Sequence, residues 1–362
     1  MDRRSFIRNA ALGGAAAAAS SLAAPAIAQG KRKLTMVTSW PRGFAGVWDA
    51  AEVTANAITQ ITDGTLEIEV KAAGELVGAF EVFDAVSSGQ ADMYHAADYY
   101  FVNKHPAFQF FTALPFGMVA TEFNAWYYHG NGQKLHDELA GIFNLKPFIA
   151  GNTGLQAGGW FRKEIKSPDD FKGLKFRMPG FGGKVLSELG VSIQNLPGGE
   201  IYQALASGAI DGTEWIGPWA DEKAGFQEIT KIYYAAGMHE PSASLSVTTN
   251  LDVWNSLSPA HQKAIETAAG YANIWSLAQF QMNNGAALRR LKAEGVKVLQ
   301  FPDSVWEAMG EAAKKVISGY LSDDLFKKIY DDYVPAMKDI SGWLSVSEGV
   351  YVKQRDRVMS DM

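Results

Sequence analysis

Residues 204–215 have the sequence ALASGAIDGTEW, and residues 85–96, AVSSGQADMYHA, repeat its pattern. In both, a run with helical spacing ends at Ser-Gly, two residues follow, and an aspartate opens the next segment. A helix followed by a strand, occurring twice with the same pattern, indicates two similar lobes, each of which presents a strand end to a shared cleft. Glycine is common at helix ends, so a chance likeness is the alternative. Glu214 and His95 occupy matching positions in the two stretches.

Hydrophobic patterns on either side of these stretches predict an α/β fold. In the amino-terminal part, strand, helix, strand, helix and strand are predicted over 33–38, 44–61, 66–70, 76–87 and 92–96. The later part has a similar pattern: a strand, two helices and a second strand are predicted over 174–178, 182–189, 199–207 and 211–216. A long helix from Ser258 through Leu288 and beyond would form a spine across both lobes, and the chain after Asp303 has helical spacing. The patterns predict two doubly wound sheets around a central cleft.

We expect the chain to divide into an export segment, two discontinuous lobes and a helical tail. The export segment is predicted at residues 1–28. The two lobes are predicted as 29–150 plus about 241–275 (lobe I) and 151–240 plus about 276–335 (lobe II). The tail, 336–362, carries an apolar stripe that consists of Val346, Val350, Tyr351 and Val358. An exposed stripe would bind a second subunit, whereas the alternative is a helix packed on its own chain.

The amino terminus has the features of an export signal, which takes no part in the fold of the mature chain. Arg3 and Arg4, with Phe6, precede an alanine-rich run, and the small residues at 26–28 match a signal peptidase site. The paired arginines are similar to the twin-arginine export signal, and an ordinary Sec signal is the alternative. The apolar run is short and mostly alanine and glycine, which argues against a membrane anchor. We therefore expect the mature protein in the periplasm.

Charge and cysteine content exclude several classes of partner and site. Removal of residues 1–28 takes away three arginines and one aspartate, so the net charge falls from −6 to about −8. Such a charge argues against nucleic acid or anionic lipid as a partner. The chain has no cysteine, which excludes disulfides, thiolate metal sites and a lipid-modified cysteine.

Motifs of the common enzyme classes are missing from the sequence. It contains no Gly-x-Ser-x-Gly elbow, no His-Glu-x-x-His, no Walker phosphate loop and no Gly-x-Gly-x-x-Gly after a predicted strand. The sequence therefore favours a binding protein over an enzyme. An exported lyase or hydrolase is the less favoured alternative.

A few polar residues have the chemistry of a ligand site. Arg177 lies on the polar face of the predicted strand 174–178, and a guanidinium at a strand end can bind a carboxylate through two hydrogen bonds. A surface arginine is the alternative. Hard oxygen ligands, which suit sodium or calcium and not zinc or copper, are offered by Gln156, Glu214 and Glu240. Their spacing matches no metal motif, so three ordinary surface residues are the alternative.

Three segments carry a resemblance that covers almost the whole mature chain: 173–180, GLKFRMPG; 206–215, ASGAIDGTEW; and 254–262, WNSLSPAHQ. With them, the chain resembles the solute-binding subunits of tripartite ATP-independent periplasmic (TRAP) transporters. Within that family it is similar to the branch that binds α-keto acids, through 152–162, NTGLQAGGWFR; 213–218, TEWIGP; and 221–223, DEK.

The resemblance implies a two-lobed periplasmic binding protein fold, with a spine helix and a helical carboxy-terminal extension, that closes on a small organic anion. It implies that Arg177 pairs with the ligand carboxylate and that a metal cation, sodium rather than calcium, bridges protein and ligand. The implied cation ligands are the side chains of Gln156 and Glu214, the backbone carbonyl of Trp215, and Glu240. The residues implied to contact the substrate are Arg177, Asn152, Gln156, Tyr99, Tyr100 and Trp215.

The function implied by the resemblance is capture of a small 2-oxo or 2-hydroxy monocarboxylate, such as pyruvate or lactate, for delivery to a TRAP membrane permease. Alternatives are a sugar acid, polyol or other carboxylate in the same fold, and a ligand sensor that docks to a receptor. Met238 and His239 stand where the branch leads us to expect aromatic residues, which points to an altered preference for substrate size. The tail resembles the dimerising extension of this branch, so we expect a homodimer.

Overall fold

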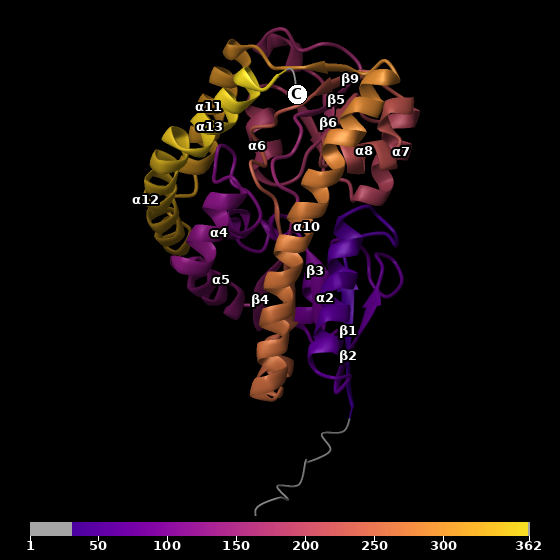
Figure 1. The fold of residues 1–362 in the computed structure, drawn as a ribbon, viewed down its shortest axis with the longest axis vertical. Helices are drawn as coiled ribbons and strands as arrows, with labels where there is room; N and C mark the ends of the chain where they lie inside the picture. The colour runs from indigo at the N-terminus through magenta and orange to yellow at the C-terminus, as the bar shows by residue number, and fades with distance from the viewer. Residues whose placement is uncertain (1–30, 361–362) are drawn as a thin grey trace, which may run out of the picture. The chain divides into compact units, whose positions relative to one another are not determined.

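The computed structural model describes residues 31–360 and contains two β-sheets with surrounding helices. The two sheets and the helix α10, which runs alongside both, are visible in Figure 1. The predicted export segment, 1–28, lies outside the described residues. Within residues 31–360, no helix combines the length and the apolar character needed to cross a bilayer.

The first sheet has five strands in the order β2-β1-β3-β10-β4. β1 and β3 are parallel, whereas β10 is antiparallel to both of its neighbours, β3 and β4. The bounds of these strands are β1 Arg32–Thr38, β2 Leu66–Lys71, β3 Met93–Ala96, β4 Leu145–Asn152 and β10 Ser244–Asn250. The predicted order of strands and helices in the amino-terminal part is therefore confirmed.

The second sheet has six strands in the order β11-β9-β5-β8-β6-β7. β6 is parallel to β7 and β8, and β9 is parallel to β11, whereas β5 is antiparallel to β8 and β9. The bounds are β5 Gly159–Phe161, β6 Lys175–Arg177, β7 Ser192–Gln194, β8 Gly212–Thr213, β9 Ile232–Tyr234 and β11 Lys297–Leu299. Each sheet draws one strand from the chain after residue 240, so the chain crosses between the sheets more than once.

Helices connect and cover the strands of both sheets, as expected for a doubly wound α/β fold. Those before the spine helix are α2 Val47–Ile61, α3 Val82–Ser87, α4 Ala120–His129, α5 Gly132–Gly141, α6 Gly180–Glu188, α7 Gly198–Ser207, α8 Pro218–Ala224 and α9 Leu251–Asn255. The strands and helices confirm the predicted fold class. The exact lobe boundaries, at about 150, 240, 275 and 335, stay predictions.

The two stretches that repeat one another in the sequence form equivalent corners of the two sheets. α3 leads into β3 beside β1, and α7 leads into β8 beside β6. Asp92 Oδ2 accepts a hydrogen bond of 2.7 Å from Thr35 N, and Asp211 Oδ2 accepts one of 2.9 Å from Lys175 N. The N–H of each aspartate in turn donates to the carbonyl of the same partner residue. The sequence repeat therefore corresponds to one local structure that is used twice.

Two predicted elements are shorter in the structure than in the prediction. The helix predicted over 76–87 begins only at Val82, because the preceding residues form turns in which Gly78 N donates to Glu81 Oε2 at 2.8 Å. The strand predicted over 211–216 spans only Gly212–Thr213, because both neighbouring strands end beside Thr213. The following residues, Glu214 and Trp215, consequently lie beyond the carboxyl end of strand β8.

The predicted spine is helix α10, Pro259–Ala293, which packs on α2 and β4 of the first sheet and on α8 beside the second. Ser276 Oγ accepts a hydrogen bond of 2.8 Å from Asn152 N at the end of β4. Further along, Asn284 Oδ1 accepts one of 3.1 Å from Trp219 N at the start of α8. α10 is therefore hydrogen-bonded to β4 of the first sheet and to helix α8.

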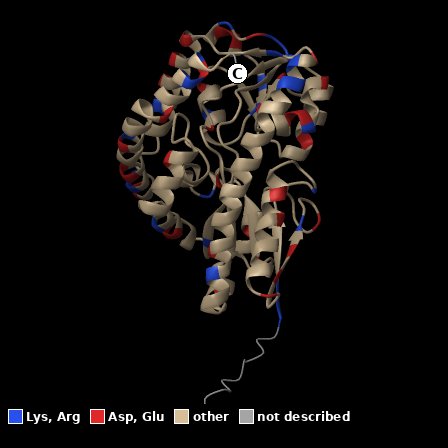
Figure 2. Cartoon of the chain, viewed as in Figure 1, with Lys and Arg blue, Asp and Glu red and all other residues tan. Residues whose placement is uncertain are grey.

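The residue composition of the middle of α10 is consistent with a helix that packs against both the first sheet and α8. Residues 267–288 contain no Lys, Arg, Asp or Glu, and Figure 2 shows the same stretch free of charged colour. A helix that packs on more than one side needs uncharged residues on more than one face.

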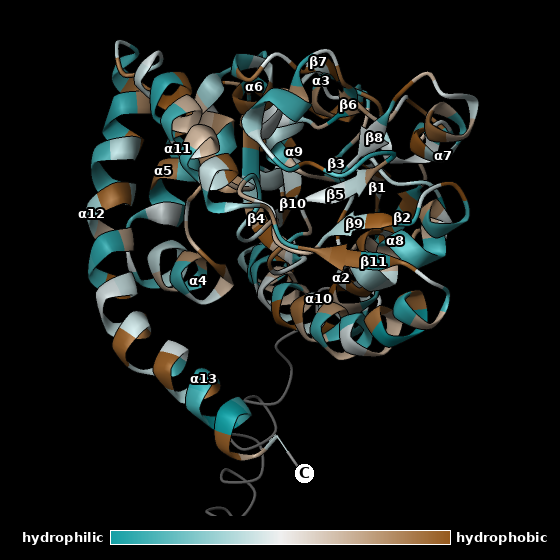
Figure 3. Cartoon of the chain, turned by 90° about the horizontal axis from the view of Figure 1, so that it is seen from above, coloured by the Kyte–Doolittle hydropathy of each residue, from teal (hydrophilic) through white to brown (hydrophobic). Residues whose placement is uncertain are grey.

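The carboxy-terminal part is helical, as predicted, and forms α11 Asp303–Ser318, α12 Asp324–Val346 and α13 Glu348–Val358. α11 packs on α6, and α12 packs on α4 and α5. α13 has no buried residue and extends away from both sheets in Figure 3. The predicted stripe is exposed, with exposed fractions of 66 % for Val346, 47 % for Val350, 66 % for Tyr351 and 59 % for Val358.

We expect the two repeated aspartates to make similar contributions to stability. Replacement of Asp92 or Asp211 by alanine removes an acceptor from a strand N–H, which should lower the free energy of unfolding by about 1–3 kcal/mol. Denaturant unfolding measures this change, and Asp356→Ala on the exposed helix α13 is the control, with an expected change within about 0.5 kcal/mol. A loss in one variant only would refute the equivalence, and unchanged stability in both would refute the contribution of these bonds.

Candidate functional site

Ends of strands from both sheets bring the predicted site residues together. Arg177 is the last residue of β6, and Glu214 and Trp215 follow β8. Gln156 follows β4, and Glu240 precedes β10. Ligand sites in open α/β sheets lie at such strand ends, because side chains there project from the sheet into a crevice.

The centre of the site is a buried ion pair between Arg177 and Glu214, both 0 % exposed. Arg177 Nη1 donates to Glu214 Oε1 and, at 3.4 Å, to the Glu214 backbone carbonyl, while Nε donates to Leu196 O at 3.0 Å. The guanidinium lies over the Trp215 ring, 5.4 Å from its centroid. The remaining nitrogen, Nη2, is buried without a hydrogen-bond partner. A charged donor is therefore left for an incoming acceptor.

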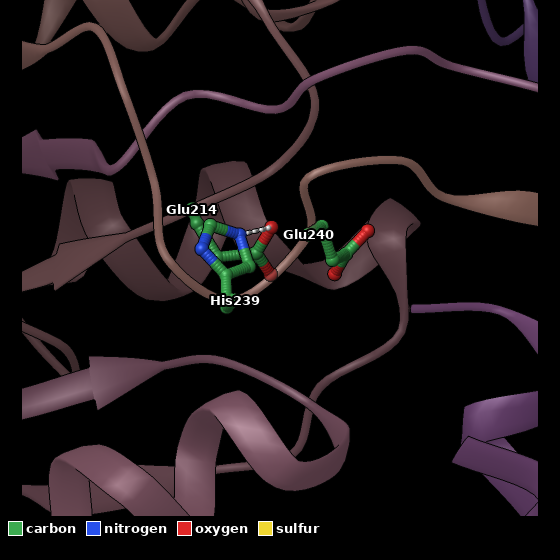
Figure 4. A group of neighbouring side chains, drawn as sticks. All are labelled: Glu214, His239 and Glu240. Atoms are coloured by element: carbon green, nitrogen blue, oxygen red, sulfur yellow. Dashed lines mark hydrogen bonds and ion pairs between the residues drawn. The ribbon is translucent and has the colours of Figure 1, made fainter. Parts of the chain in front are cut away.

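Carboxylate and imidazole groups gather beside this ion pair. Ligand atoms of Glu214, His239 and Glu240 lie within 4.8 Å of one another, and all three residues are buried. Figure 4 shows the imidazole beside the Glu214 carboxylate, with Glu240 next to them, and His239 Nε2 is 3.3 Å from Glu214 Oε2. Glu240 Oε2 and Gln156 Oε1 are buried acceptors without a hydrogen-bond partner. Acceptors of this kind fit a hard cation, which supplies the missing positive partner.

Burial raises the pKa of Glu240 well above the usual value, and the charge of Glu214 raises it further. The opposing effects, from Arg177 and from hydrogen bonds to Tyr99 and Gln156, are smaller. Two buried carboxyl groups therefore share one arginine. Without a cation, ionisation of both groups at once is unfavourable.

Aromatic residues form one wall of the site. Tyr99 and Tyr100 lie on the 3₁₀ helix Asp98–Phe101, with ring centroids 4.9 Å apart. Burial raises the pKa of Tyr100 to about 12 and that of Tyr99 well above its usual value. Both hydroxyls are therefore protonated at neutral pH and can donate hydrogen bonds to an anion.

A cavity of about 10 Å³, with room for about one water molecule, adjoins Gln156, Trp215 and the two tyrosines. Most of its remaining wall is apolar: Trp40, Val47, Ala97, Ile216, Ala243 and Leu245, with Thr153 as the one further polar residue. The structure thus brings together Tyr99, Tyr100, Gln156 and Trp215 around one cavity, next to Arg177, Glu214 and Glu240.

Asn152 is placed differently from the other predicted site residues. Its Nδ2 donates to Ser242 Oγ at 2.9 Å, and its Oδ1 accepts from Gly154 N at 2.8 Å. It does not line the cavity, and its side chain stabilises the turn that leads to Gln156. The predicted contact between Asn152 and substrate stays a prediction.

Two residues of the site were not predicted from the sequence. His239 was noted as a departure from the expected aromatic pair, but its contact with Glu214 was not foreseen. Asp221 Oδ1 accepts 3.0 Å hydrogen bonds from Ile216 N and Gly217 N, so its carboxyl group holds the segment that carries Trp215. Burial raises the pKa of Asp221 to about 7, against the effect of these bonds. The Asp-Glu-Lys at 221–223 was the available signal for this residue.

Comparison with known proteins defines the class to which this fold and site belong. Residues 39–323 match the family described as bacterial extracellular solute-binding protein, family 7. The monocarboxylate 2-oxoacid-binding periplasmic protein of Nostoc sp. is 42 % identical over 317 residues, which are 87 % of each chain.

Solved structures of TRAP solute-binding proteins are similar along nearly the whole chain. One from Bordetella bronchiseptica, a mixed-occupancy dimer with copurified calcium and picolinate, is 38 % identical with a TM-score of 0.90, over 92 % of this chain and 99 % of that one. Another, from Pseudoalteromonas atlantica with bound sodium and pyruvate, is 35 % identical with a TM-score of 0.86, over 89 % and 99 %. The chain therefore belongs to the family 7 extracellular solute-binding proteins, and it is a solute-binding protein of the TRAP type.

The raised pKa of Glu240 predicts a pH-dependent stability of the cation-free protein. In the unfolded chain this carboxyl ionises near its usual value of 4.5, whereas the folded chain retains the proton to higher pH. The folded state binds more protons in that window, so stability falls as the pH rises through it. Glu240→Gln should remove this slope in thermal unfolding of chelator-treated protein, while Glu307→Gln, at an exposed position, should keep it. Identical slopes for wild type and Glu240→Gln would contradict the assignment.

Proposed function

We propose that the protein captures a small 2-oxo or 2-hydroxy monocarboxylate through Arg177 and a bridging cation. The observation that carries the proposal is the set of unpartnered buried atoms: one cationic donor, Arg177 Nη2, and two acceptors, Gln156 Oε1 and Glu240 Oε2. A carboxylate supplies the acceptor that the arginine lacks, and a cation supplies the positive charge that the two oxygens lack.

Each residue has a separate part in this proposal. Arg177 Nη2 donates to the ligand carboxylate, since Nη1 and Nε are already used. The side chains of Gln156, Glu214 and Glu240 hold the cation, together with the backbone carbonyl of Trp215. When bound, the cation offsets the negative charges of the glutamates and the ligand, which allows them to share a dry site. The protonated tyrosines donate to the remaining ligand oxygens.

The ligands of the relatives support a chelating carboxylate. Pyruvate and picolinate, named in the two similar structures, each place a second donor atom next to the carboxylate: a 2-oxo group in one and a ring nitrogen in the other. Both can hold one cation through two atoms. The relative from Nostoc sp. is named for binding of 2-oxoacids.

The cavity wall supports a short aliphatic side chain on the ligand. Val47, Ala97 and Leu245 offer no partner for hydroxyl groups, and burial of an unpaired hydroxyl is costly. Sugar acids and polyols, the alternative ligands, would leave several hydroxyls unpaired there. A methyl or ethyl group at the 2-oxo carbon fits such a wall.

The family places the protein outside the cytoplasm, and we propose that twin-arginine export delivers it to the periplasm. There it would hand its ligand to the TRAP permease, without chemical conversion, when the two lobes open. The lobes, 29–150 plus about 241–275 and 151–240 plus about 276–335, would move about the connecting segments as a hinge.

Calorimetry with pyruvate tests the proposed site. Protein that has been treated with a chelator and dialysed against sodium-free buffer should bind pyruvate only after sodium or calcium is added. Glu214→Ala should abolish binding. Arg177→Met should lower the affinity by about 30-fold or more, which corresponds to about 2 kcal/mol for loss of a buried charged hydrogen bond. Arg289→Met, on the exposed face of α10, is the matched control.

Ligand analogues keep the test decisive if the Arg177 variant fails to fold. Pyruvamide, which lacks the carboxylate charge, should bind wild-type protein at least about 30-fold more weakly than pyruvate. Glucuronate should give no heat. Tight binding of pyruvate by chelator-treated Glu214→Ala protein would refute the cation bridge.

We further propose that the tail, 336–362, joins two copies into a homodimer. The exposed stripe on α12 and α13 continues the apolar face that begins with Trp343, which is 69 % exposed. One similar structure is a dimer. Apolar helix faces of this kind are usually covered by a partner.

The oligomeric state tests the role of the tail. Tyr351→Glu places a charge in the stripe and should convert a dimer into a monomer in light scattering coupled to gel filtration, with pyruvate affinity unchanged. Ile142→Glu, directly after α5 at a position that is 62 % exposed, is the control and should remain dimeric. A wild-type protein that is monomeric at all concentrations would rule the proposal out.

A further inference from the structure

A second and larger cavity lies beside the ligand site. Its volume is about 250 Å³, whereas that of the site cavity is about 10 Å³. It lies between the segments that follow β1 and β2 and the start of α7, and most of its lining is small or apolar, as at Pro41, Ala73, Ala79 and Pro197. Among the described residues, none lines both cavities. A wall of side chains therefore separates the ligand site from space that could hold an apolar group.

One part of this wall is Trp40, the second residue after β1. It lines the site cavity, whereas its chain neighbours Ser39 and Pro41 line the larger one. Another part is Trp215: a Cβ on Gly198, whose neighbours on both sides line the larger cavity, would lie 2.4 Å from the Trp215 ring. Two indole rings therefore stand between the ligand site and the larger cavity.

A chain of hydrogen bonds holds the Trp40 ring in place. Its Nε1 donates to His95 Nδ1 at 2.8 Å, and His95 Nε2 lies 3.3 Å from Ala150 O. Because Nδ1 accepts, the proton of the neutral imidazole is on Nε2, which donates to that carbonyl. Burial lowers the pKa of His95 to about 4, so Nδ1 remains an acceptor at neutral pH. Trp40 is only 2 % exposed, and rotation of its ring away from His95 would leave a buried N–H unpaired, which is costly.

We infer that Trp40, held by His95, sets the longest side chain that a 2-oxoacid ligand can carry. This inference rests on the proposed function, because it concerns the same ligand. A methyl or ethyl group stays within the site cavity, whereas a butyl group meets the Trp40 ring. Without the indole, the longer chain reaches the larger cavity, where Pro41, Ala73 and Ala79 offer apolar contacts.

A pair of ligands tests the role of Trp40. Calorimetry with pyruvate and with 2-oxohexanoate, each with calcium present, gives the ratio of their dissociation constants for every variant. A general loss of folded protein affects both ligands and leaves this ratio unchanged. Wild-type protein should bind 2-oxohexanoate at least about 50-fold more weakly than pyruvate, and Trp40→Ala should reduce this ratio at least about tenfold. An unchanged ratio in Trp40→Ala, or equal affinities in the wild-type protein, would overturn the inference.

Matched variants separate removal of the wall from a simple gain of space. Val47→Ala enlarges the site cavity without opening it to the larger one and should change the ratio by less than about threefold. Trp254→Ala, the same substitution at a residue that lines neither cavity, should leave the ratio unchanged. If Trp40→Ala fails to fold, Trp40→Phe keeps an aromatic ring and should still lower the ratio at least about threefold. An effect of Val47→Ala as large as that of Trp40→Ala or Trp40→Phe would overturn the inference.

The positioning role of His95 has its own readout. His95→Leu removes the acceptor of the Trp40 N–H and should lower the ratio at least about threefold, because the ring is no longer fixed. His95→Gln, whose amide oxygen can accept the same hydrogen bond, should keep the wild-type ratio. Equal ratios in the two variants would refute the role of His95.

Failure of this inference differs from failure of the proposed function. If pyruvate binds with a cation and every variant keeps the wild-type ratio, the cation-bridged site stands and the role of Trp40 is refuted. If pyruvate does not bind the wild-type protein with sodium or with calcium, the proposed function itself fails.

Discussion

The buried pair of Arg177 and Glu214 determines what the site can bind. Neither side chain has contact with water, and the two are brought together by pairing of β6 with β8, in which Arg177 lies opposite Thr213. Glu214 N also donates to Arg177 O at 3.2 Å, so a backbone hydrogen bond holds the two residues together in addition to the ion pair. An ion pair in such surroundings contributes little net stability, because both groups have lost their hydration. Under the proposed function, the pair instead serves to accommodate the charge of the ligand.

The two sheets use the same corner for different purposes. Asp92 and Asp211 make the same bonds to the neighbouring strand, yet the position three residues later is His95 in one sheet and Glu214 in the other. His95 is fully buried, accepts a 2.8 Å hydrogen bond from Trp40, and has its pKa lowered by burial to about 4, so it is neutral. At this corner the first sheet therefore carries an uncharged side chain, and the second carries a charged one.

Much of the fold could be predicted from the sequence because its strands and helices have local signatures. The half-buried strands alternate, and the spine helix has a Ser-Pro start at 258–259 with a long uncharged run behind it. β10 was not predicted: all seven of its residues are buried, the polar ones included, and its partners β3 and β4 lie about a hundred residues or more away. Arg177 was found because it lies near the end of a predicted strand, and Glu214 because its carboxylate is a hard oxygen ligand in a segment that carries the family resemblance.

His239 could not be placed for a related reason. The segment from Gly237 to Glu240 belongs to no helix or strand, and only long-range backbone bonds fix it: Gly237 N to Gln156 O at 3.1 Å, and Gln156 N to Glu240 O at 3.0 Å. These two bonds connect the segment that contains His239 and Glu240 to Gln156, so the three residues have fixed positions relative to one another. Glu214 and Glu240 face a single arginine, so the negative charge of the site exceeds the positive charge by one when both glutamates are ionised. An anion that enters such a site brings further negative charge, which supports the proposal that ligand and cation bind as a coupled pair.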